Sequence, residues 1–230
     1  MCFSATASFS AGAVLLGIGT LTWRSALARH RRRDLPFAAI PLLFAAQQLL
    51  EGVIWLTFSD EAPQLNSVMT HVYSFFSHVL WPVYVPVAVV LMEPAGWRRR
   101  ALVAFVAAGV VVGAYLLYVL LTFPVVSRPT GQHIEYDSPH FFAAVTMTLY
   151  LLSTAISPLL STHRMVLVFG ALALLSFGAA YAFYAAWFIS VWCFFAALLS
   201  GVVYLHFGVR RRGRSRSNDS GMSAHRSQEA

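Results

Sequence analysis

A carboxylate and two amides interrupt an otherwise apolar stretch of the chain, QQLLEGVIW, at Gln47, Gln48 and Glu51. A charged group in hydrocarbon is costly, so a carboxylate placed there usually belongs to a functional site and has a polar partner. Gln47 precedes Glu51 by four residues, which places the two side chains on one face of a helix. Glu51 is therefore the predicted centre of an intramembrane polar site.

A second polar face follows in the stretch HVYSFFSHVLWP, where His71, His78 and Trp81 are separated by seven and three residues. Those spacings put the three side chains on one side of a helix. Pro82 lacks the N–H that would bond the His78 carbonyl, so it predicts a kink and a freed carbonyl at His78. A kinked helix whose polar face only packs inward is the alternative interpretation. The predicted ligand pocket consists of Glu51, Gln47, Gln48, His71, His78 and Trp81.

Imidazole, thiolate and carboxylate groups are suitable donors for zinc, copper or iron. Such donors are predicted in the outer half of the bilayer at His71, His78, Glu51, His140 and Cys193. His71 and His78 lie roughly 10 Å apart along a helix axis, so they would serve two sites, or a haem would take one of them with a histidine such as His140. A hydrogen-bonded pair that only locks helices together is the simpler alternative.

The chain has two cysteines and no lysine. Cys2 and Cys193 both fall on the predicted oxidising side, so a disulfide between the first and last spans is one interpretation, and a buried apolar Cys193 is the other. The missing lysine excludes a retinal Schiff base.

The elements that carry these residues are predicted to be transmembrane helices. Of the 230 residues, 58% are hydrophobic and only 11% are charged. A span needs about 20 mostly apolar residues, and the sequence contains seven such windows, at about 3–23, 36–58, 68–92, 101–123, 140–160, 164–186 and 187–207. The predicted fold is all-α, a polytopic bundle of seven transmembrane helices over residues 1–207. The arginine-serine-rich residues 208–230 are predicted to form a disordered cytoplasmic tail.

Arginine is concentrated in every second connection, after the first, third, fifth and seventh windows. By the positive-inside rule the N-terminus lies outside and the C-terminus is cytoplasmic. The arginines of these connections give the chain most of its formal charge of +7. We expect them to contact anionic lipid headgroups. The predicted partner is therefore the lipid bilayer, and no nucleic acid is expected. The predicted topology also places Glu51 roughly 10 Å below the outer end of its helix.

No catalytic constellation is recognisable, since the chain lacks a His-x-x-x-His pair late in the sequence and a Gly-x-Ser-Gly nucleophile turn. The leading hypothesis is an outward-facing pocket that binds a small ligand, a transition-metal ion or haem. A proton-linked small-solute transporter is one alternative, because a buried carboxylate with nearby histidines suits a proton relay. A seven-helix sensor without an attached output domain is the other.

The start MCFSATASF, with QQLLEG in the second window and SHVLWP in the third, resembles an uncharacterised bacterial family of multi-pass membrane proteins that begin Met-Cys-Phe-Ser-Ala. The resemblance covers about residues 1–207. It implies a single multi-helix domain in a bacterial cytoplasmic (inner) membrane, and it assigns no functional residues.

Overall fold

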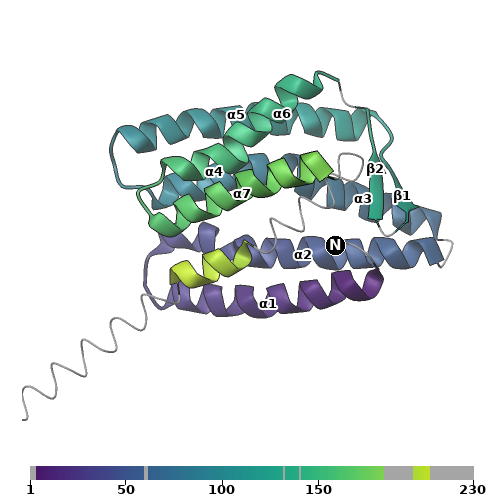
Figure 1. Ribbon diagram of the computed structural model, residues 1–230, viewed down its shortest axis with the longest axis horizontal. Helices are drawn as coiled ribbons and strands as arrows, with labels where there is room; N and C mark the ends of the chain where they lie inside the picture. The colour runs from purple at the N-terminus through teal and green to yellow at the C-terminus, as the bar shows by residue number, and fades with distance from the viewer. Residues whose placement is uncertain (1–3, 60–61, 132, 140, 184–198, 208–230) are drawn as a thin grey trace, which may run out of the picture.

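The computed structural model describes residues 4–59, 62–131, 133–139, 141–183 and 199–207, and within them the chain is mostly helical (Figure 1). Five helices there are long and apolar enough to cross a membrane, namely Ala5–Leu27, Arg32–Ser59, Pro63–Met92, Trp97–Thr122 and Ala143–Leu160. They coincide with the first five predicted windows. The sixth window corresponds to the shorter apolar helix Arg164–Ala180. Of the seventh window, only residues 199–207 fall in the described part, and residues 200–207 are helical.

Helices α1 (Ala5–Leu27) and α2 (Leu35–Ser59) form an antiparallel pair along one side of the bundle (Figure 1). Small residues allow them to approach closely. A Cβ added at Gly12 would lie 2.8 Å from Leu49, and one added at Gly19 would lie 2.5 Å from Leu42. In lipid no hydrophobic effect drives helices together, so close packing of this kind stabilises the pair. Helix α1 therefore fixes the face that α2 turns towards the rest of the bundle.

The third span is one continuous helix with a π-helical segment in its middle: α3 (Pro63–Ser74), η2 (Phe75–Leu80) and α4 (Trp81–Met92). Helix α5 (Trp97–Thr122) packs against it through a Gly-x-x-x-Gly motif, Gly109 and Gly113. A Cβ at Gly109 would lie 1.9 Å from the Pro82 carbonyl oxygen, and one at Gly113 would lie 3.1 Å from Val83. These two glycines therefore allow α5 to approach the third span closely.

The fifth span shows the same irregularity as the third. Helix α6 (Ala143–Leu151) continues into a π-helical segment, η3 (Leu152–Ile156), and a short 3-10 turn, η4 (Ser157–Leu160), before α7 (Arg164–Phe183). In both spans a proline, Pro82 or Pro158, lies two residues after the π-helical segment. Because proline cannot donate to the helix ladder, it leaves a carbonyl without its usual partner, and the helix widens to compensate.

A β-hairpin lies in the connection between the fourth and fifth spans. It consists of the antiparallel strands β1 (Val126–Thr130) and β2 (His133–Asp137), with Ser127 opposite Tyr136. The all-α prediction is corrected at this point, because alternate residues of these strands pack on the bundle. The hairpin lies across the end of the bundle where α2 ends and α3 begins (Figure 1).

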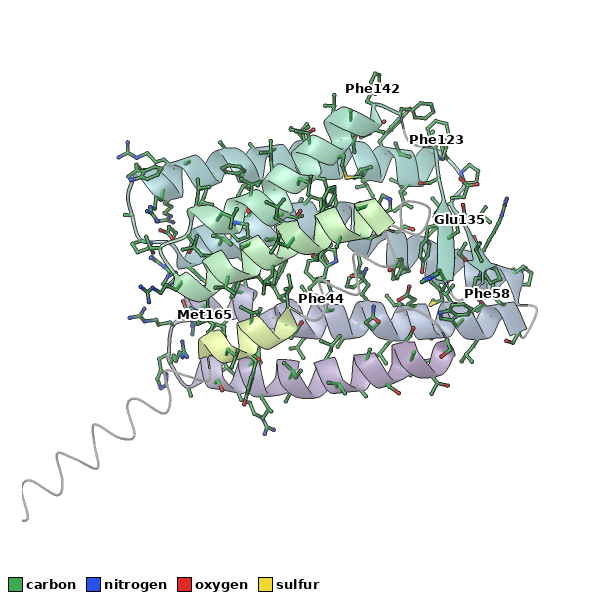
Figure 2. All side chains as sticks on the ribbon, viewed as in Figure 1. Phe44, Phe58, Phe123, Glu135, Phe142 and Met165 are labelled. Carbon is green, nitrogen blue, oxygen red and sulfur yellow. The ribbon has the colours of Figure 1, made fainter. Side chains whose placement is uncertain are left out.

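The other end of the bundle holds the basic connections, between α1 and α2, between α4 and α5, and before α7 (Figure 1). Nitrogen atoms of long side chains gather there (Figure 2). Arg29 donates to the backbone carbonyls of His206 and Phe207, and Arg98 donates to those of Leu160 and Ser161. Arginine at helix C-terminal ends satisfies carbonyls that have no partner within the helix.

Candidate functional site

The centre of the site is a fully buried carboxylate on α2. Glu51 is 0% exposed and Gln48, one turn earlier, is 1% exposed. The Gln48 amide donates from Nε2 to Glu51 Oε2 over 3.3 Å. Because the side chain is inside the protein, the carboxylate does not face lipid.

A second bond joins this group to the third span. The indole N–H of Trp81 donates to Gln47 Oε1 over 2.7 Å, and both side chains are buried. The Trp81 ring stacks on Phe44 of α2, with ring centroids 4.1 Å apart and planes 22° apart, and Phe44 is marked in Figure 2. Trp81 lies well inside the span, away from the bilayer surface where tryptophan is usual, because it bonds Gln47 across the helix interface.

In the side-chain amides of Gln47 and Gln48, these bonds use only one of the two polar atoms. Within the described part of the chain, Gln47 Nε2 and Gln48 Oε1 are buried without a hydrogen-bond partner. A buried amide atom without a partner costs about 1–3 kcal/mol, so such groups usually bond ordered water or a ligand. The cluster of Gln47, Gln48, Glu51 and Trp81, called the Glu51 cluster below, thus holds one unused donor and one unused acceptor beside a carboxylate.

The π-helical segment lies directly before Trp81. In it the Trp81 backbone N–H bonds the Phe76 carbonyl, five residues back instead of four. The Ser77 carbonyl would take its next bond from residue 82, which is proline, and instead it accepts the Tyr150 hydroxyl at 2.5 Å. Sequence reasoning placed the freed carbonyl at His78, whereas the carbonyl that takes a side-chain donor is that of Ser77, because the segment has shifted by one residue. Short π-helical segments frequently occur at functional sites.

The two predicted histidines of the third span bond to their own helix. His71 Nδ1 lies 2.7 Å from the Ser67 carbonyl oxygen. His78 Nδ1 lies 2.8 Å from Ser77 Oγ and 3.1 Å from the Ser74 carbonyl oxygen. Both rings are half-buried. These bonds do not exhaust the contacts of His78 or of Glu51.

No group of three His, Cys, Asp or Glu side chains that could hold a metal ion is found among the residues the structure describes. Two of the five predicted metal ligands, His140 and Cys193, lie outside those residues, as does Cys2 of the predicted disulfide. The predicted metal site and the predicted disulfide therefore stay predictions. The Gln47, Gln48 and Trp81 side chains of the described cluster are hydrogen-bonding groups.

The hairpin packs on α2 and α3 beside this region. Its buried residues Ile134 and Tyr136 pack with Ile54 of α2 and Tyr73 of α3, and the rings of Tyr73 and Tyr136 stack at 4.5 Å. Alternation along β2 turns Glu135 and Asp137 to the opposite face. The acidic residues of this connection therefore do not extend the Glu51 cluster.

A hydroxyl and amide network fixes the hairpin in place. The Ser127 hydroxyl donates to Asn66 Oδ1 over 3.0 Å and lies 2.8 Å from the Thr70 hydroxyl oxygen. Asn66 in turn donates to Thr57 Oγ1 over 2.8 Å. This network joins β1 to the end of α2 and to α3. The hairpin is therefore attached to the two spans that carry the Glu51 cluster.

Sequence reasoning missed a second buried carboxylate. Glu93, at the end of α4, is 2% exposed and accepts from the Ser161 hydroxyl and the Thr162 backbone N–H, each at 3.0 Å. It therefore binds the start of α7, where a negative charge is stabilising. Its position beside arginine-rich residues gives the impression of an ordinary surface carboxylate, although the sequence MEPAG places it at a tight connection.

The comparisons with known proteins support one part of the resemblance, membership of an uncharacterised family. No curated protein matches the chain. A protein-family comparison matches residues 1–220 to the family described as "Family of unknown function (DUF6629)". The chain, a membrane-like helical bundle with a buried Glu51 cluster, belongs to this family of unknown function.

Proposed function

We propose that this protein is an integral membrane protein that binds a small polar ligand at the Glu51 cluster. The observation that carries the proposal is the pair of buried amide atoms, Gln47 Nε2 and Gln48 Oε1, without partners among the described residues beside a buried carboxylate. A ligand that accepts a hydrogen bond from Gln47 and donates one to Gln48 or Glu51 would complete this set.

The remaining predicted residues have secondary roles in this proposal. Trp81 forms a flat wall, since its ring already stacks on Phe44. His71 and His78 would be ligands or proton acceptors at the edge of the cluster. A transition-metal ion or haem in the site would require donors in addition to Glu51, and His140 and Cys193 are the proposed sources.

Proton-linked transport of a small solute is a second candidate, favoured by one observation. The third and fifth spans each contain a π-helical segment before a proline, and Gly109 of α5 lies against both Pro82 and Ser153. Irregular helices that meet near a polar site are typical of transporters. A sensor role has no comparable observation in its favour.

The proposed setting is a bacterial cytoplasmic membrane, crossed seven times by residues 1–207, with the N-terminus outside and the 208–230 tail in the cytoplasm. The basic connections at one end of the bundle support this orientation by the positive-inside rule. They would contact anionic lipid headgroups, each arginine contributing about 1 kcal/mol near such a surface. The hairpin would then face the outside, above the Glu51 cluster.

The proposal can be tested on protein extracted from its own membrane in a mild detergent. Native mass spectrometry and elemental analysis are compared for the wild type, Glu51→Gln and Glu93→Gln. Glu93→Gln is the matched control, because it neutralises the other described buried carboxylate, at the opposite end of the bundle, and keeps an acceptor for Thr162.

We expect a bound small molecule or metal on the wild type and on Glu93→Gln, and its loss from Glu51→Gln. An absorption spectrum with a Soret band that His78→Ala removes would identify haem. A wild type without any bound species, or equal occupancy in all three proteins, would contradict the proposed site.

A further inference from the structure

Two spans far apart in the sequence are joined by one hydrogen bond at their irregular segments. The Tyr150 hydroxyl, on α6, donates to the Ser77 carbonyl in η2. Tyr150 is 9% exposed and Ser77 is 5% exposed. The bond is therefore screened little by surrounding water, and hydrogen bonds in such surroundings are electrostatically strong.

The Ser77 carbonyl has no backbone donor because of the π-helical register. In a regular α-helix it would accept the N–H of residue 81, four positions on. Here the Trp81 N–H bonds Phe76 instead. Five positions on from Ser77 stands Pro82, which has no N–H. The Tyr150 hydroxyl supplies the donor that the backbone lacks.

In the fifth span, a hydroxyl of the same helix bonds the corresponding carbonyl. In η3 the Ser157 N–H bonds Leu152, five residues back. The Ser153 carbonyl precedes Pro158 by five residues, and it accepts the Ser157 hydroxyl at 2.5 Å. In each π-helical segment a hydroxyl bonds the carbonyl that the proline leaves without a donor. Only in the third span does that hydroxyl come from a different span.

The register of η2 decides where Trp81 points. Return of the Trp81 N–H to the Ser77 carbonyl would restore α-helical bonding and turn the helix by about 100° per residue between the two sides of the segment. The Trp81 indole, which now donates to Gln47 and stacks on Phe44, would then leave the Glu51 cluster. In the present register the Tyr150 hydroxyl is the donor to the Ser77 carbonyl, and in the α-helical register the Trp81 N–H would be its donor.

We infer that Tyr150 is a positioning residue for the Glu51 cluster: its bond to Ser77 holds the π-helical register that keeps Trp81 on Gln47, and its release frees Trp81. The fifth span thereby regulates the site without contacting it. The inference rests on the proposed function only in calling this cluster a binding site, since the coupling of Tyr150 to Trp81 exists without any ligand.

The test uses labels that the sequence makes unique. Ser77–His78 is the only Ser-His pair in the chain, so 13C-carbonyl serine with 15N-histidine gives a single peptide signal that reports the Ser77 carbonyl. Labelling with 15N-tryptophan reports the Trp81 indole, identified as the resonance that Trp81→Phe removes. Both are measured by NMR in detergent micelles for the full chain.

Tyr150→Phe removes only the hydroxyl. We expect the Ser77 carbonyl signal to move as it does when a hydrogen bond is lost or exchanged, and the Trp81 indole signal to move with it. Tyr115→Phe is the matched control, since that hydroxyl donates to the Phe141 carbonyl elsewhere in the molecule, and it should leave both signals in place. A Trp81 indole unchanged by Tyr150→Phe would overturn the inference.

A second variant distinguishes the loss of the Tyr150–Ser77 bond from a general loss of packing. Pro82→Ala restores a backbone N–H that can bond Ser77 or His78, so the Tyr150 hydroxyl becomes dispensable. We expect Tyr150→Phe to cause no further change of the Trp81 indole signal in the Pro82→Ala protein. Equal changes in both backgrounds would contradict the inference. If the response is intact but no ligand binds, the proposed function fails and the positioning role of Tyr150 stands.

Discussion

Trp81 donates its indole N–H to Gln47 over 2.7 Å, and this bond joins the third span to the second four residues before Glu51. Gln47 and Trp81 are 34 residues apart in the sequence. Their pairing converts two unusual polar residues in apolar helices into one buried structure, on which the proposed site depends.

Loss of the indole N–H should therefore cost stability. Trp81→Phe keeps an aromatic ring against Phe44 and leaves Gln47 Oε1 buried without its donor, so we expect a loss of about 1–3 kcal/mol in the free energy of unfolding. Reversible unfolding in mixed micelles measures it. Trp97→Phe is the control, because Trp97 is 67% exposed. Equal stability of the two variants would show that the bond contributes nothing.

The contact between α5 and Pro82 should tolerate no added methyl group. Gly109→Ala would place a Cβ 1.9 Å from the Pro82 carbonyl oxygen, whereas none of the described residues lies within 4 Å of the corresponding position at Gly178. We expect Gly109→Ala to lower the free energy of unfolding by about 1–3 kcal/mol. Gly178→Ala should be neutral or slightly stabilising. A neutral Gly109→Ala would mean that α5 does not pack there.

Glu93 should stabilise the opposite end of the bundle. Glu93→Ala leaves the Ser161 hydroxyl and the Thr162 N–H without their acceptor, and we expect a loss of about 1–3 kcal/mol. Hydrogen exchange of the first turn of α7 should rise with it. Glu135→Ala, which removes a half-buried carboxylate bonded to Thr130, should leave that turn unchanged. Unchanged exchange in Glu93→Ala would count against this capping role.

The hairpin should become less stable in acid. Burial lowers the pKa of His133 below its usual 6.5. The unfolded hairpin then binds a proton at higher pH than the docked one, so its stability is fully present above pH 6.5 and falls as the pH drops from there through the lowered pKa. NMR titration of the His133 ring and hydrogen exchange of β2 measure both effects. His133→Gln should remove this part of the pH dependence, and an unaltered pH profile would contradict it.

Hydropathy and charge predicted the five long spans closely, because about 20 apolar residues and an arginine-rich connection are strong local signals. The partner of Trp81 could not be predicted, since counting depth along a helix places residues at a level but does not say which faces meet. Glu51 and Gln47 were singled out because polar residues in apolar runs are rare, and both side chains are buried in the structure.

Other features depend on tertiary packing. The Pro82 irregularity was predicted as a kink with a freed His78 carbonyl, yet the helix absorbs it by a shift to five-residue bonding that moves the freed carbonyl to Ser77. That choice depends on Tyr150, which is 73 residues away in the sequence. The hairpin was missed because VVSRPTGQHIEYD combines turn residues with charges, and its burial against Tyr73 becomes visible only in the fold.

The central claim is that the Glu51 cluster binds a ligand, and the most direct measurement is an experimental density map of the protein purified from its own membrane. We expect density that is not protein within about 3.5 Å of both Gln47 Nε2 and Gln48 Oε1, and we expect this density to be absent from the map of Glu51→Gln. A map in which protein side chains bond both amide atoms, with no other density beside Glu51, would contradict the claim.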